Sequence, residues 1–447
     1  MKFTSLLCAL FCIISIQAQN IEINATTEIA GLFSNDDENP FWTYRNTNRT
    51  FGAGTSLAVI GDVEMNYAIG NANLSGGVAG YYRNGVSDEF QRRDLYVGFE
   101  NSWLRITAGA KKQEEVLNGL TTSNKNFLWS GNARPLPGLL IEANEPVRIS
   151  NTFSIDWGLG HYVLNDDRYV DNPRVHYKRL QLNVNLSEKS MLKARLQHFA
   201  QWAGTSPTEG KLLSNLGAYY DVFLAKRSDQ QTEVGEQINA IGNHLGSYFL
   251  EYNLSTQSSI FSVYHEHPFE DGSGTRLANF PDGIWGISLE MKEPKLLDAI
   301  VYEYVDTSDQ SGDTSMVSGS DGYFGNGVYR SGWTYEDQVI GLPFILLDPE
   351  VVINDRNSKF TSNRTRAHHL GATGTYKRFA WKAKASYVTF LGRFQRPFDP
   401  EVNAVFTYAS LQYNFDQWGQ LRAFTGFDIS NVNDTIIAAG LSYSYLF

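Results

Sequence analysis

Cysteine is almost missing from this chain of 447 residues, because only Cys8 and Cys12 are present. Both lie inside an expected leader, so the processed chain has no thiol for a disulfide or for nucleophilic chemistry. No stretch after the leader approaches the roughly 20 consecutive apolar residues that a membrane-spanning helix needs. An exported chain of this kind could cross a membrane only as a closed barrel, in which every backbone group is paired.

Positive charge is also in deficit. Lys and Arg number 37 against 48 Asp and Glu, which makes the formal net charge -11. Proteins that bind nucleic acids carry basic patches that neutralise phosphates, and this sequence has no basic tract. We therefore expect no nucleic-acid partner.

Common catalytic motifs are missing as well. The nucleophile elbow G-x-S-x-G, the phosphate-binding P-loop and the zinc motif H-E-x-x-H do not occur. We assign no catalytic residue, no metal and no cofactor, and we expect that the protein is not an enzyme. A hydrolase remains open as an alternative, since a Ser/His pair need not be close in sequence.

The first 18 residues have the form of a secretory signal. Lys2 precedes an apolar run from Leu6 to Ile16, and Ala18 supplies a small residue for cleavage. We expect cleavage after Ala18, so that residues 19–447 form the exported domain.

The last thirteen residues, TIIAAGLSYSYLF, alternate strictly between apolar and small or polar side chains. This period of two predicts a strand with one apolar face, and a lipid-facing strand carries Tyr and Phe at the membrane interface. A terminal Phe447 resembles the signal by which bacterial outer-membrane barrels are recognised for insertion. The alternative is an edge strand of a soluble β-sandwich.

The same alternation recurs along the chain and predicts an all-β fold, a transmembrane antiparallel outer-membrane β-barrel of about 18 strands. Short links alternate with long ones, which is typical of such barrels and has no reason to occur in a sandwich. The expected strands are 21–32, 55–69, 73–82, 91–100, 103–110, 138–145, 147–159, 174–186, 190–201, 244–254, 257–267, 282–290, 295–305, 364–376, 379–390, 403–415, 419–430 and 435–447.

This topology assigns the long loops to the cell exterior. A helix is expected in one of them, starting near Ser206-Pro207 and continuing to Leu224. It could be a lid or plug, or a helix that packs on the rim. The expected outer loops are about 33–54, 111–137, 202–243, 268–281, 306–363 and 391–401.

The candidate binding site lies in the longest loop, where residues 322–335 read GYFGNGVYRSGWTY. Aromatic rings suit sugar rings by stacking, and an Arg fork can hold a carboxylate through two hydrogen bonds. The alternative is that these rings form a small core of the loop or cap the barrel. The predicted glycan-binding residues are Tyr323, Tyr329, Arg330, Trp333 and Tyr335.

Two further groups of charged or titratable side chains have a simpler interpretation than a functional site. His265 and His267 share one strand face, but two histidines do not make a metal site, and a place on the aromatic girdle is preferred. Lys382, Lys384 and Arg422 should face the lumen, where they could guide anions. A solvated wall with carboxylate partners such as Asp428 is the preferred interpretation.

Nine sequence strings, in this order, resemble the capsule-assembly Wzi family of outer-membrane proteins, in the form common in Bacteroidetes-type bacteria. The resemblance implies a monomeric 18-stranded barrel that acts as a surface lectin, holds capsular polysaccharide on the outer membrane and has no enzyme activity. The strings are Pro40-Phe41-Trp42, SGNARPLPGL (130–139), VHYK (175–178), GNHLG (242–246), HPFEDGSG (267–274), DGIWGI (282–287), YEYVDTSDQSG (302–312), GNGVYRSGWTY (325–335) and IGLPF (340–344).

Two functions of different classes follow. The first is attachment of capsular or another surface polysaccharide to the cell, with polysaccharide and outer-membrane lipid as partners. The second is a porin-like diffusion channel for small solutes, supported by the basic lumen face of the late strands. Ion conductance in planar bilayers separates them.

Overall fold

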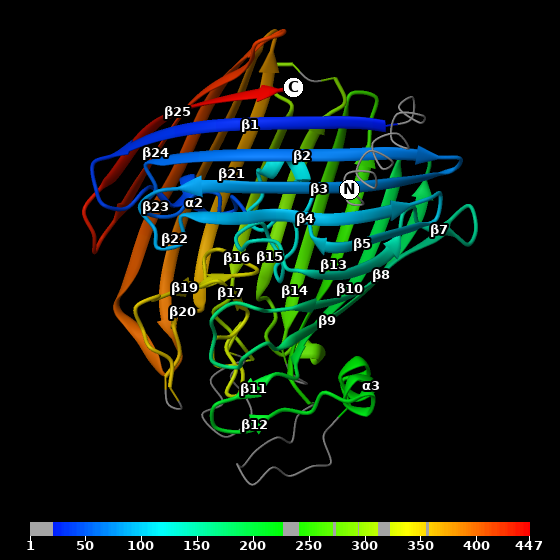
Figure 1. Ribbon diagram of the computed structural model, residues 1–447, viewed down its shortest axis with the longest axis vertical. Helices are drawn as coiled ribbons and strands as arrows, with labels where there is room; N and C mark the ends of the chain where they lie inside the picture. The colour runs from blue at the N-terminus through cyan, green and yellow to red at the C-terminus, as the bar shows by residue number, and fades with distance from the viewer. Residues whose placement is uncertain (1–20, 227–240, 271–273, 294, 312–321, 355–356) are drawn as a thin grey trace, which may run out of the picture.

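The protein is a closed antiparallel β-barrel in the computed structural model, which describes residues 21–226, 241–270, 274–293, 295–311, 322–354 and 357–447. The expected cleavage after Ala18 lies outside the described residues. Each long strand pairs with the next, and β1 closes the barrel on β25 (Figure 1). The sheet has 19 strands, but β6 and the two-residue β7 share the neighbour β8, so 19 - 1 = 18 strands surround the lumen.

The strands of the wall alternate in direction along the chain. They are β1 (Ile21–Ser34), β2 (Leu57–Ile69), β3 (Ala72–Arg83), β4 (Phe90–Glu100), β5 (Leu104–Ala110), β6 (Gly138–Ala143), β7 (Val147–Arg148), β8 (Phe153–Val163), β9 (Arg174–Ser187), β10 (Ser190–Trp202), β13 (Asn243–Ser255), β14 (Ser259–Phe269), β15 (Gly283–Met291), β16 (Ala299–Asp306), β21 (Arg364–Tyr376), β22 (Phe379–Arg393), β23 (Arg396–Phe415), β24 (Gly419–Ser430) and β25 (Ile436–Leu446).

The small elements belong to the long loops. They are α2 (Phe41–Tyr44), the 3-10 turns η2 (Val116–Gly119) and η3 (Gly274–Arg276), β11 (Thr205–Ser206), β12 (Gly210–Lys211), α3 (Leu216–Leu224), β17 (Thr334–Tyr335), β18 (Gln338–Val339), β19 (Leu346–Leu347) and β20 (Phe360–Ser362). Among the described residues, no helix is long and apolar enough to cross a membrane.

The last strand shows why the wall has two different faces. Leu441 is 59% exposed, whereas Ser442 beside it is 4% exposed and turns toward the lumen. β25 pairs with β24 on one side and with β1 on the other, so it has no free edge. The barrel prediction for this strand is confirmed, and the edge strand of a soluble sandwich is excluded.

Links at the two ends of the barrel differ in length. At the turn end, short links such as Asn101–Trp103 join neighbouring strands, and the Asn101 side chain accepts hydrogen bonds from the backbone N–H groups of Trp103 (3.0 Å) and Leu104 (2.9 Å). Such a side-chain turn is a property of Asn itself. At the loop end lie the long segments, and the one that carries β11, β12 and α3 extends beyond the strands (Figure 1). The predicted alternation of short and long links is therefore confirmed for most of the chain.

One predicted loop, 391–401, is wrong. β22 and β23 continue to Arg393 and Arg396, which are paired across a two-residue link. This part of β23 contains Pro397 and Pro400, and pairing of β23 with β24 begins only at Ala404. The prolines therefore lie where β23 is an edge strand, and an edge strand tolerates a missing N–H donor.

The predicted helix is present, but it begins later in the sequence than expected and lies outside the lumen rather than in it. The Asn215 side chain accepts a hydrogen bond from the N–H of Ala218 at 2.8 Å and starts α3, whereas Ser206 belongs to the β11–β12 hairpin. Ala218 packs against Trp202, whose outward direction on β10 follows from the 45% exposure of Leu196 six residues earlier. α3 is thus a helix on the outer rim of the barrel (Figure 1).

Candidate functional site

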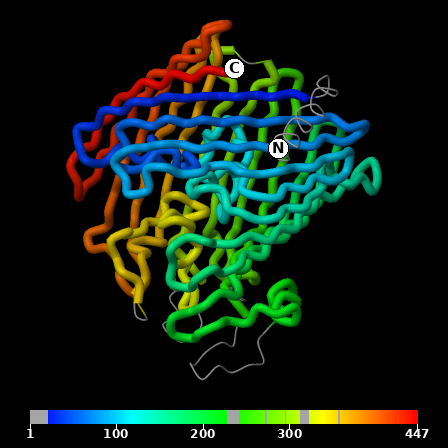
Figure 2. The backbone as a smooth tube through the Cα atoms, viewed as in Figure 1, coloured from blue at the N-terminus to red at the C-terminus, as the bar shows by residue number. Residues whose placement is uncertain are grey.

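Two long loops meet inside the lumen and pair through their backbones. The N–H of Ser130 donates to the carbonyl of Ile340 at 2.8 Å, and the N–H of Leu342 donates to the carbonyl of Phe127 at 2.9 Å. We call the folded assembly of residues 39–51, 116–137 and 322–347 the plug. Figure 2 shows its yellow part, from the longest loop, within the outline of the barrel.

The plug has an apolar core that is continuous with the lumen wall. Phe127, Trp333 and Phe344 of the plug belong to the same buried cluster as Phe199 and Tyr264 of the wall. Burying this much aromatic surface is strongly favourable. The loop-end half of the lumen is therefore packed with side chains rather than lined by them.

Carboxylates of the wall hold the plug by accepting hydrogen bonds from its backbone N–H groups. The sequence analysis did not predict these residues. A carboxylate acceptor makes a stronger hydrogen bond than a neutral one. The available signal was an acidic residue at an inward position among apolar neighbours of a strand. The pairs are Glu266 with Phe127 (2.8 Å), Glu303 with Thr122 (2.6 Å) and Asp428 with Phe41 (2.7 Å).

All five predicted glycan-binding residues belong to the plug, and four of them are buried. Tyr323, Trp333 and Tyr335 are 0% exposed and Tyr329 is 4% exposed. The Trp333 ring lies 5.2 Å from the ring of Phe199, and its Nε1 donates to the carbonyl of Leu128 at 2.5 Å. In this conformation these rings pack on protein, as the alternative interpretation of the loop proposed.

The tyrosine hydroxyls of this segment are engaged too. Tyr329 Oη donates to the carbonyl of Ala203 at 3.2 Å, and Tyr335 Oη donates to Asn165 Oδ1 at 2.8 Å. Burial raises the pKa of both phenols, so the hydroxyls remain protonated donors near neutral pH. Their roles here are those of core tyrosines with satisfied polar ends.

Arg330 differs from the other four because it is only half-buried. Its guanidinium lies 5.7 Å from the ring centroid of Tyr169, which comes from the loop between β8 and β9. The N–H of Tyr169 donates to Ser331 Oγ at 2.9 Å and ties the two loops together. Tyr169 was not predicted, because nothing in the sequence indicates that Tyr169 and Ser331, 162 positions apart, are in contact. Glycan contact by the five predicted residues stays a prediction, with Arg330 as its accessible member.

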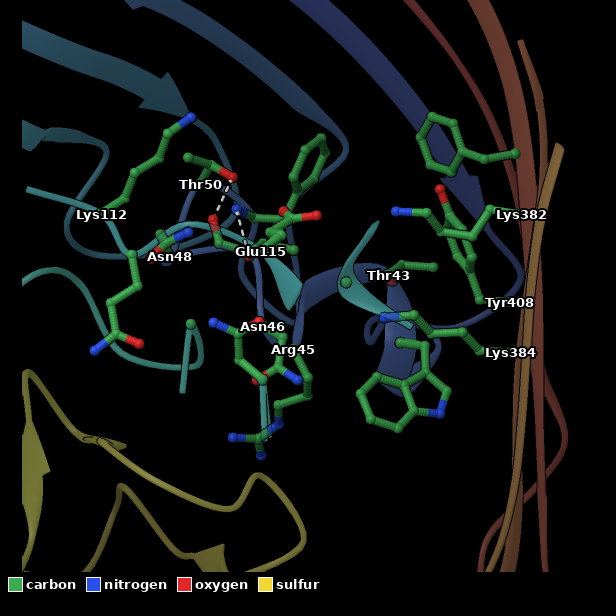
Figure 3. Close-up of a pocket in the computed structure, with 18 of the residues that line it drawn as sticks. Thr43, Arg45, Asn46, Asn48, Thr50, Lys112, Glu115, Lys382, Lys384 and Tyr408 are labelled. Atoms are coloured by element: carbon green, nitrogen blue, oxygen red, sulfur yellow. Dashed lines mark hydrogen bonds between the residues drawn. The ribbon is translucent and has the colours of Figure 1, made fainter. Parts of the chain in front are cut away.

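A second candidate lies beneath the plug, in a lumenal pocket of about 390 Å³. Figure 3 shows Lys382 and Lys384 pointing into this space from β22. The prediction that Lys382, Lys384 and Arg422 face the lumen is confirmed by their place in its lining. The prediction that Asp428 is a carboxylate partner of these cations is wrong, because Arg422 pairs with Glu28 instead. Asp428 accepts a hydrogen bond from the backbone N–H of Phe41 in the plug.

The histidines of β14 lie on the outward face of the strand, where they contact other protein groups. The ring of His265 stacks on Trp285 with 3.7 Å between centroids, and His267 Nδ1 lies 3.2 Å from the carbonyl of Asp282. Within the described part of the chain, no group of three or more His, Cys, Asp or Glu residues could hold a metal ion.

Comparisons with known proteins place this geometry in a family. A family model described as capsule assembly protein Wzi matches residues 17–344. No curated protein sequence is significantly similar to the chain.

Solved structures share the fold. Wzi of Escherichia coli, an outer membrane protein involved in group 1 capsule assembly and a carbohydrate-binding β-barrel, aligns with a TM-score of 0.59 at 12% identity, over 96% of this chain and 85% of that chain. OccK3 (OpdO) of Pseudomonas aeruginosa aligns with a TM-score of 0.50 at 11% identity, over 95% of this chain and 96% of that chain. At these identities the likeness shows the fold alone, which is that of outer membrane β-barrels.

Proposed function

Because the chain belongs to the capsule assembly protein Wzi family, we propose that it binds capsular or another surface polysaccharide and attaches it to the outer membrane. The observation that supports attachment over diffusion is the packed core of the plug, in which Trp333 and Phe344 join the lumen wall. A lumen filled in this way favours a binding protein. The proposal assigns the barrel, acting as a monomer, no catalytic step.

Arg330 and Tyr169 are the proposed contact for an acidic glycan at the loop end. An aromatic ring beside a guanidinium offers stacking on a sugar and charge-assisted hydrogen bonds to its carboxylate. The aromatic residues Tyr323, Tyr329, Trp333 and Tyr335 support this surface from beneath. Tyr169 joins the predicted set because it lies against Arg330.

Retention of polysaccharide on cells tests the proposal. Arg330→Ala should weaken glycan binding by about 1.5–3 kcal/mol, the typical contribution of a hydrogen bond to a charged group, and should shift polysaccharide from cells into the medium. Arg396→Ala, which removes an exposed Arg at the same end of the barrel, is the matched control. Deletion of residues 322–335 is a poor test, because it would remove the buried rings of the plug.

The measurement needs total polysaccharide, cell-bound polysaccharide and a heat-modifiability gel for barrel assembly. Shedding by Arg330→Ala with normal synthesis and an intact barrel supports both attachment and this contact. Normal retention in cells that lack the whole protein would contradict attachment. Normal retention with Arg330→Ala alone would contradict the contact only.

A diffusion channel is the second candidate, and one observation favours it. Lys382 and Lys384 line the lumenal pocket, and unpaired cations in a lumen could guide anions. A large steady conductance in planar bilayers with anion selectivity that falls on Lys384→Gln would favour the channel. A closed barrel would count for attachment.

A further inference from the structure

The lumenal pocket lies on the side of the plug that faces the turn end of the barrel. Loop residues form one wall, and inward residues of β1, β2, β4 and β22 to β24 form the other. Between the pocket and the turn end, the inward side chains of Glu22, Thr26 and Gln420 are exposed. Solvent therefore reaches the pocket region from the end where the short links lie.

The pocket contains two lysine ammonium groups that form no ion pair with the wall strands that the structure describes. Other lumen cations have carboxylate partners, such as Arg422 with Glu28 and Arg93 with Asp94 at 2.8 Å. Among the described residues, no hydrogen bond or ion pair engages the ammonium group of Lys382 or that of Lys384. An amine held among protein groups without a partner is costly unless water or a ligand solvates it.

The acidic residues that line the pocket come from one loop and one strand. Glu114 and Glu115 line the pocket from the loop between β5 and η2, and both are exposed. Glu28 lines it from β1 but is paired with Arg422. Lys112 also lines the space, so the unpaired lysines outnumber the unpaired carboxylates.

Three lining residues also carry polar atoms without a partner. Arg45 Nε, Asn46 Oδ1 and Thr121 Oγ1 belong to lining residues, are buried, and have no hydrogen-bond partner. Buried polar groups in proteins are almost always paired. Each of these atoms is closed to solvent, so it lies behind the pocket surface and is not offered to a ligand there.

Aromatic rings complete the lining. Lys384 Nζ lies 4.9 Å from the ring centroid of Trp42, and Tyr408 faces the same space (Figure 3). Pockets for small organic ligands have volumes of about 300–1,000 Å³, and this one is about 390 Å³. The space suits one or two sugar units better than a bare inorganic anion.

We propose that this pocket is a binding site for a carboxylate-bearing sugar unit that enters from the turn end of the barrel. Lys382 and Lys384 donate hydrogen bonds to the carboxylate of the sugar. The inference rests on the proposed polysaccharide function and adds to it a second site, on the opposite side of the plug from Arg330. A saccharide chain would then meet the protein at both ends.

Binding of D-glucuronate to the whole barrel in detergent micelles tests the site, with D-glucose and sulfate as the comparison probes. Calorimetry should show glucuronate binding more tightly than either. Lys382→Gln and Lys384→Gln should each weaken glucuronate binding roughly 10- to 100-fold, the loss typical of a hydrogen bond to a charged group. Arg396→Gln, an exposed position at the loop end that does not line the pocket, should leave the affinity unchanged.

The outcomes separate the site from the proposed function. Unchanged glucuronate affinity in the Lys382→Gln/Lys384→Gln double variant, with a heat-modifiable barrel, would overturn the site. Sulfate binding as tightly as glucuronate would reduce it to an anion site and overturn the sugar assignment. Lysine-dependent glucuronate binding, in a protein whose loss leaves polysaccharide retention normal, would uphold the site and overturn the function.

Discussion

Replacing Trp333 by Ala should loosen the plug while leaving the barrel intact. The indole is fully buried, lies against Phe199 and donates to the carbonyl of Leu128 at 2.5 Å. Truncating a buried Trp to Ala costs about 3–5 kcal/mol. Leaving the Leu128 carbonyl without its donor adds about 1–3 kcal/mol.

These magnitudes predict a large change in plug opening. The lower end of this sum, about 4 kcal/mol, already raises the open population roughly 1,000-fold, since each 1.4 kcal/mol is a factor of ten. Trp333→Phe should show a smaller effect, because it keeps most of the buried ring and loses only the hydrogen bond. The strands of the wall keep their pairing, so the barrel itself should remain assembled.

Two measurements follow the opening. Limited proteolysis of the intact barrel should cut within residues 322–347 much faster in Trp333→Ala, and planar-bilayer conductance should rise. Any loss of glycan binding should accompany these changes, whereas Arg330→Ala should lose glycan binding with normal proteolysis. Trp333→Ala with an unchanged proteolysis rate but abolished glycan binding would refute the packing role and restore Trp333 as a glycan contact.

Two further predictions concern the loops. Burial raises the pKa of Asp282 to about 7, despite hydrogen bonds from the Gln310 N–H and the Tyr323 hydroxyl. Between about pH 4 and pH 7 the folded protein therefore binds one proton more at Asp282 than the unfolded chain does, so local stability should fall as pH rises from about 4 to about 7. Hydrogen exchange of nearby amides, measured against Asp282→Asn at each pH, should show this fall in the native protein only, and equal pH profiles would contradict it. On α3, Leu216 and Tyr220 are 87% and 56% exposed, and the helix packs on outward Trp202 of β10, so this apolar stripe should contact lipid at the membrane interface. A spin label on Tyr220→Cys, with Cys8 and Cys12 absent, should be as accessible to oxygen as one on Leu250→Cys, and accessibility matching a label on exposed Val352→Cys would contradict lipid contact.

The amino-acid sequence determined the wall of this protein. A strand has a two-residue period, so Leu441 and Ser442 take opposite faces wherever the strand is placed, and the alternation is readable from neighbours alone. Turn residues such as Asn101 act within three positions. For these reasons the strand number, the barrel closure and most short links could be predicted.

The destination of the loops was decided only by the tertiary structure. Trp333 meets Phe199, Ile340 meets Ser130, and Arg330 meets Tyr169, all across more than 100 residues, and no local period records such contacts. The sequence of an aromatic-rich loop does not show whether its rings bind a sugar or pack against the barrel wall, because the hydrophobic effect that buries them is non-directional. In the folded barrel, Trp333 is buried in the core of the plug, whereas Arg330 stays accessible. Lys382 and Lys384 lie beneath the plug, and among the described residues neither forms an ion pair with a carboxylate.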